Sequence, residues 1–121
     1  MLLAILSSLS LHAQEVWDGT TDVEWSGKGT ADSPYLIGTA AELAGMAQRT
    51  NAGETFEGQY FKLTADLWLS DESTPADERP LWVPIGETTL SNEDAETNPG
   101  GFYGKDCWFK GNFDGAGHTI H

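Results

Sequence analysis

The chain has 121 residues, and 19 Asp and Glu against 6 Lys and Arg give it a formal net charge of −13 at pH 7. Nucleic acids and anionic membrane surfaces attract concentrated positive charge, so this composition argues against both as partners. Cys107 is the only cysteine, which excludes an intrachain disulfide. The length suits one small domain.

Residues 1–13 have features of a secretory signal peptide. An apolar stretch ends at Ala13, and we predict cleavage before Gln14. Leu11 is larger than the residue usual at its position, and no Lys or Arg precedes the run, so a short buried N-terminal helix or strand is the alternative. The run is shorter than the roughly 20 residues that span a membrane. We expect an exported protein at the cell surface or outside the cell, with no membrane insertion after signal removal.

Two tryptophan-containing segments follow the predicted signal. Val16–Gly19 and Glu24–Gly27 each place a Trp two residues before a Gly, and we predict two short β segments separated by a turn. Trp17 and Trp25 are expected to cover the open end of a core. A carbohydrate-stacking surface is the alternative function for these rings.

A short helix is predicted over residues 40–51, after an apolar strand at 35–37. Thr39 and Glu42 have the spacing of a capping box, which marks a helix start. Asn51 and Gly53 supply a left-handed stop. One narrow stripe of apolar residues at i, i+3 and i+4 is expected to face the core: Leu43, Met46 and Ala47.

The strongest strand signal lies at residues 56–69, where apolar and polar residues alternate. One face carries Phe61, Leu63, Ala65, Leu67 and Leu69, and the other carries Tyr60, Lys62, Thr64, Asp66 and Trp68. Residues 81–86 are apolar but contain Pro84, which predicts an edge or interrupted strand. Polar stretches at 70–80 and 87–101 are expected to be long loops.

The C-terminal segment is aromatic and rich in glycine, with a tight turn predicted at Asp114-Gly115. Residues 118–121 have the pattern of the opening of another strand. We expect the natural protein to continue beyond His121.

Several ordered blocks resemble the N-terminal region of secreted proteins from gut Bacteroides-type bacteria that carry GLUG motifs and related β-solenoid repeats. The resemblance covers about residues 25 to 120. The blocks are Trp25-Ser26-Gly27, Gly29-Thr30, Ser33-Pro34-Tyr35-Leu36-Ile37, Thr39-Ala40-Ala41-Glu42-Leu43, Asn51-Ala52-Gly53, Phe56-Glu57-Gly58, Tyr60 to Leu67, Trp82-Val83-Pro84-Ile85-Gly86 and Phe109 to Ile120.

The resemblance implies a mainly β fold: the start of a right-handed parallel β-helix, or β-solenoid, with one short N-terminal capping α-helix at about 40–51. Residues 14–121 would then form the solenoid cap and first coils, truncated at the C-terminus. Two features depart from the family pattern: the segment after Leu69 is longer and more acidic, and no full GLUG unit is present. The alternative fold is a small open β-sandwich, or a sheet packed by the same helix.

No catalytic, cofactor-binding or metal-binding residue is assigned from the sequence. His118 and His121 are three apart, which places them on opposite faces of a strand. Cys107 has acidic and aromatic neighbours that do not activate a thiol, so a buried small hydrophobe is preferred. Calcium is the one ligand that the composition favours, through loops that lack EF-hand spacing, and solvated acidic loops are the preferred interpretation. The loops are Asp71-Glu72, Asn92-Glu93-Asp94 and Asn112-Phe113-Asp114.

The predicted function is a noncatalytic, adhesin-like structural module of an exported surface protein, which caps and starts a β-solenoid. Its expected partners are the remainder of its own solenoid and a host glycan or protein. The alternative is a noncatalytic flank, or an incomplete scaffold, of a carbohydrate-active enzyme or an IgA-type peptidase.

Overall fold

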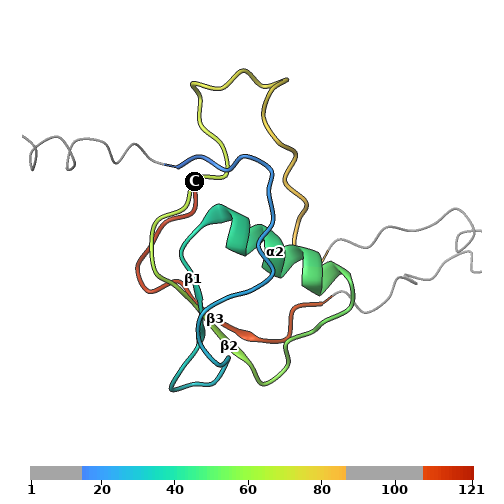
Figure 1. Cartoon of the computed structure of the whole chain (residues 1–121), viewed down its shortest axis with the longest axis vertical. Helices are drawn as coiled ribbons and strands as arrows, with labels where there is room; N and C mark the ends of the chain where they lie inside the picture. The colour runs from blue at the N-terminus through green and yellow to red at the C-terminus, as the bar shows by residue number, and fades with distance from the viewer. Residues whose placement is uncertain (1–14, 87–107) are drawn as a thin grey trace, which may run out of the picture.

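The computed structural model describes residues 15–86 and 108–121, and in these ranges the chain builds a small parallel sheet beside a helix (Figure 1). The elements in chain order are β1 (Tyr35–Ile37), α2 (Ala40–Asn51), β2 (Tyr60–Leu63) and β3 (Asn112–Asp114). The strands are parallel and lie in the order β1-β2-β3. The register aligns Tyr35 with Phe61 and Phe61 with Phe113. Successive segments therefore stack as layers of the same orientation.

A second parallel ladder lies beside this sheet and uses isolated bridges instead of full strands. Val16 pairs with Trp68, and Leu67 pairs with Ile120. Trp17 N donates to Trp68 O at 2.9 Å. After β1 the chain turns away to form α2 and does not continue beside residues 67–68. The N-terminal segment occupies that place instead. Three layers are described in each ladder, and the assignment to a right-handed β-helix stays a prediction.

The helix occupies the predicted residues, Ala40–Asn51, with Thr39 as its N-cap. Thr39 has extended backbone angles, and its Oγ1 accepts a hydrogen bond from Glu42 N at 3.1 Å. Gly53 has a φ of 110°, and its N–H donates to Thr50 O, so the left-handed stop is also present. The buried face is wider than the predicted stripe: Ala40, Leu43, Ala44, Gly45, Met46, Ala47 and Thr50.

The sequence predicted one continuous strand over the alternating residues 56–69, but the structure divides this segment. β2 ends at Leu63, the chain bends at Ala65, and pairing resumes at Leu67. Phe61, Leu63 and Leu67 are all buried, with exposed fractions of 1, 2 and 3%. Buried and exposed residues continue to alternate after the bend, because both ladders contribute side chains to the same core.

The other predicted strands need correction. Val16 makes a single bridge, and residues 24–27 form no strand. Residues 81–86 run as an irregular segment with Leu81 exposed. Asn51 holds this segment to the end of α2, since Asn51 Nδ2 donates to Pro84 O at 3.0 Å and Gly86 N donates to Asn51 Oδ1 at 2.7 Å. The C-terminal turn lies at Ala116 and Gly117, slightly later than predicted, with positive φ at both residues.

The main core lies between α2 and the two ladders. Its buried members are Ile37, Leu43, Met46, Phe56, Phe61, Leu63 and Leu67. A smaller cluster joins Trp17 to Ala40 and Ala44 on the N-terminal half of the helix. Within residues 15–86 and 108–121, no helix is long and apolar enough to cross a bilayer.

Candidate functional site

The first edge of the sheet, at β1, is covered by the chain's own N-terminal segment. Ile37 O accepts from Thr64 N at 2.9 Å, so Tyr35 and Ile37 direct their main-chain groups toward β2. In a parallel ladder, neighbouring residues direct these groups to opposite sides. Leu36 therefore faces away from β2, and its N–H donates to Ser26 O at 2.9 Å. The outward donor of this edge is satisfied.

Trp25 closes the core beside this covered edge. Its ring centroid lies 5.2 to 5.8 Å from those of Tyr35, Phe56 and Phe61, which is a favourable range for aromatic packing. Trp25 Nε1 donates to Glu42 O on α2 at 3.1 Å. Trp17 is also buried, and its Nε1 donates to Thr20 O at 2.8 Å. Both rings pack against protein, as the interpretation of these tryptophans as a core cover predicts.

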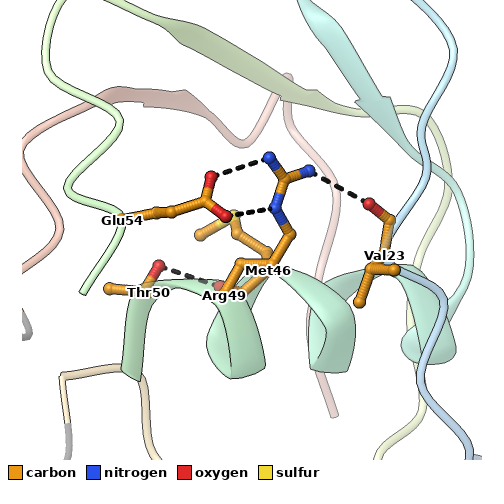
Figure 2. Close-up of polar contacts among 5 residues, drawn as sticks. All are labelled: Val23, Met46, Arg49, Thr50 and Glu54. Carbon is orange, nitrogen blue, oxygen red and sulfur yellow. Dashed lines mark hydrogen bonds and ion pairs between the residues drawn. The ribbon is translucent and has the colours of Figure 1, made fainter. Parts of the chain in front are cut away.

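Arg49, near the end of α2, fastens the N-terminal segment in place (Figure 2). Its Nε and Nη2 donate to the two carboxylate oxygens of Glu54 at 3.0 and 2.7 Å, and its Nη1 donates to Val23 O at 3.0 Å. The guanidinium carbon also lies 4.7 Å from the centroid of the Trp25 ring. The hydrogen bond with Arg49 lowers the pKa of Glu54 and raises the pKa of Arg49 itself. The Arg49–Glu54 pair therefore holds the N-terminal segment, through Val23 and Trp25, against α2.

The opposite edge, at β3, is open as far as residues 15–86 and 108–121 are concerned. Asn112 N donates to Gln59 O at 2.9 Å, so Phe113 directs its main-chain N–H and C=O away from β2. In the second ladder, Thr119 O accepts from Leu67 N at 2.9 Å and His121 N donates to Leu67 O at 2.8 Å. Ile120 therefore also faces away from its neighbour. In the described part of the chain, β3 is the last strand of the sheet and no segment lies beyond it.

Apolar side chains are exposed along this open edge. Phe113 is 38% exposed and Ile120 is 42% exposed. Their register partners are Phe61 and Leu67, which are buried core residues. Because in-register parallel strands place paired side chains on the same side, Phe113 and Ile120 continue two columns of the core by one layer. We call these two residues, with their outward main-chain groups, the open edge.

Asp66 and the two histidines connect the last layer to the layer before it. Asp66 Oδ1 accepts from Thr119 N at 3.0 Å and lies 3.2 Å from His118 Nδ1. These contacts, the Thr119 N–H first, lower the pKa of Asp66. The ring of His121 stacks on Trp68 with centroids 4.4 Å apart. The two histidines therefore have separate partners and do not converge on one point.

The loops that the sequence offered for calcium use their carboxylates locally where they are described. Asp71 accepts from Ser73 and from Thr74 N, and the Ser73 hydroxyl is the main cause of its lowered pKa. Asp114 accepts from Ala116 N at 2.8 Å and stabilises the turn after β3. Asn92-Glu93-Asp94 and Cys107 lie outside the described residues. In the described ranges, no three His, Cys, Asp or Glu side chains are grouped to hold a metal ion.

An apolar cavity of about 460 Å³ lies between α2 and residues 81–83. Trp17 and Trp82 form one wall, with their rings edge to face and their centroids 5.1 Å apart. No local sequence pattern indicates this cavity, because it depends on Asn51 holding a distant loop against the helix.

Comparisons with protein-family models, with curated proteins and with solved structures found no match to this chain. The resemblance to GLUG-containing surface proteins therefore stays a prediction.

Proposed function

We propose that this chain is a noncatalytic structural module of an exported surface protein, which closes one end of a stack of parallel β layers and begins its growth at the other. The observation that carries the proposal is the difference between the two edges. At the first edge, the outward N–H of Leu36 donates to Ser26 O. At the last edge, Phe113 and Ile120 direct their main-chain N–H and C=O groups away from the preceding layer, and their side chains are exposed.

The difference between the two edges is meaningful because leaving a sheet edge uncovered has a physical cost. An uncovered sheet edge presents unpaired N–H and C=O groups that can template pairing with other chains, so proteins usually cover or interrupt such edges. Here the cover at β1 combines Ser26, the Trp25 ring and the Arg49 contacts. A chain that covers one edge with dedicated residues and extends the core to the other has the asymmetry that a capping module needs.

The test is amide hydrogen exchange of the full chain, followed by NMR, with Trp25→Ala as the perturbing variant. In the parent chain we expect the Leu36 amide to exchange at least tenfold more slowly than the amides of Phe113 and Ile120, because Leu36 is the one of the three with an acceptor among residues 15–86 and 108–121. Trp25→Ala should accelerate exchange at Leu36 while leaving Phe113 unchanged. The matched control is Trp108→Ala, which removes an exposed indole outside the cover. Equal exchange at Leu36 and Phe113 in the parent chain would overturn the capping role.

A further inference from the structure

We infer that the open edge binds an extended polypeptide segment that runs parallel to β3, and that this segment carries large apolar residues at two positions six or seven apart. The inference rests on the proposed function and names the partner of the open edge. The register and spacing of the described residues and the net charge of the whole chain support it.

The main-chain groups at the open edge define the first requirement. Phe113 and Ile120 both direct N–H and C=O groups away from the preceding layer, one in each ladder. A single segment can pair with both residues only if it follows β3, bends as the chain bends after Asp114, and rejoins the second ladder. Both existing ladders are parallel, so a parallel segment would follow the same path as the layer below and bend at the equivalent position.

The spacing of the apolar side chains defines the second requirement. Phe61 and Leu67 are six residues apart in the second layer, and Phe113 and Ile120 are seven apart in the third. In the second layer these positions are buried, and in the third they are about 40% exposed because no described residue covers them. A partner with apolar residues at equivalent positions would bury both columns again, and burial of apolar area is the main driving force for such association.

Charge argues against a second copy of the chain as the occupant. Each copy has a net charge of −13, so two copies repel at low ionic strength. A two-fold related copy would also pair β3 with β3 in antiparallel orientation, and the two columns would not continue. A short extended segment is not bound by two-fold symmetry and can pair in parallel, and tethering it to the same module replaces a bimolecular encounter by an intramolecular one.

The experiment adds a second copy of residues 108–121 to the C-terminus of the full chain through a flexible Gly/Ser linker of about 20 residues, whose typical span is about 25 Å. This added segment carries the Phe and Ile seven residues apart that the edge requires. The matched control has Asp in place of that Phe and that Ile in the added copy only. Hydrogen exchange and melting are measured on both proteins.

We expect the added segment to slow exchange of the original Phe113 and Ile120 amides at least tenfold and to raise the melting temperature, and the Asp control to do neither. Orientation is read with a nitroxide at either end of the added copy, in a Cys107→Ala background. A label at its start should broaden amides near Asn112, and a label at its end should broaden amides near Ile120.

Three outcomes would overturn the inference: no slowing at Phe113 and Ile120, equal slowing by the Asp control, or the reversed broadening pattern of an antiparallel segment. The Leu36 amide, read in the same spectra, separates this failure from failure of the capping role. If Leu36 stays protected while the added segment remains unpaired, only the assignment of the partner is wrong.

Discussion

At the scale of single residues, close approach of the N-terminal segment to α2 decides which side chains are tolerated. Gly45 lies on the buried face of the helix, directly beneath the main chain of Asp22. A Cβ built at Gly45 would lie 1.8 Å from Asp22 O, and Asp22 N donates to Ala41 O on the same helix at 2.8 Å. The glycine is therefore required by packing, although glycine in a helix interior normally costs about 1 kcal/mol relative to alanine.

Gly45→Ala is predicted to destabilise the protein by about 1 to 3 kcal/mol, because the added methyl group overlaps a backbone carbonyl. This is the opposite sign from the effect of helix propensity alone. The measurement is the free energy of unfolding from urea denaturation. Gly115→Ala is the control, since a Cβ at Gly115 meets nothing within 4 Å. A stabilised Gly45→Ala protein would show that the N-terminal segment does not lie against α2.

At the scale of elements, α2 is the part of the chain whose limits depend most on local chemistry. The Thr39 hydroxyl accepts from Glu42 N and lies 3.1 Å from the Glu42 carboxylate. The strands show the opposite behaviour. β2 stops at Leu63 although the alternating pattern continues, and after the bend at Ala65 the chain pairs again through Leu67 and Ile120 in the second ladder.

Thr39→Ala should cost about 1 kcal/mol of stability through loss of the N-cap. Differential scanning calorimetry would detect this as a lower melting temperature. The control is Gln48→Ala, an exposed position inside the same helix, where the change should stay within about 0.5 kcal/mol. An unchanged melting temperature for Thr39→Ala would mean that the helix starts at another residue.

At the scale of the whole molecule, contacts between layers decide how firmly the last layer is held. Asp66 is the charged group in this contact, and it accepts from Thr119 N and lies beside His118. Its pKa is lowered from the usual value of 3.8, chiefly by the Thr119 N–H. A carboxyl whose pKa is lower in the folded state contributes stability above its unfolded pKa and loses that contribution as the pH falls through its folded pKa.

The melting temperature of the parent protein should therefore exceed that of Asp66→Asn above about pH 4, and the difference should shrink as the pH falls below 3.8, the usual pKa of this carboxyl. Asn keeps an acceptor for Thr119 but not the charge, so the variant isolates the ionised form. Melting followed by circular dichroism across this pH range provides the check, together with the Thr119 amide shift. A difference that does not shrink as the pH falls below 3.8 would show that Asp66 acts through its shape alone.

Most contacts of the candidate site could not be predicted from sequence patterns. The aromatic segment that contains Phe113 was recognisable, but its place at an open edge depends on pairing with β2, a strand far earlier in the chain. Trp25 was expected to cover a core, whereas the partners that fix it, Glu42 and Arg49, come from a different element. Such contacts join residues distant in sequence, and no local pattern encodes them.

The sequence by itself determined the helix and part of the core, including Leu43, Met46 and Phe61. Capping hydrogen bonds and burial periodicity act within a few residues, so local patterns alone were enough to assign Thr39, Leu43 and Phe61. Only the tertiary structure decided where the alternating segment bends, that Ser26 satisfies one edge of the sheet, and that Phe113 and Ile120 remain outward at the other. The physical reason is that edges and layers are properties of how distant segments pair, and that pairing is set by the packing of the whole core.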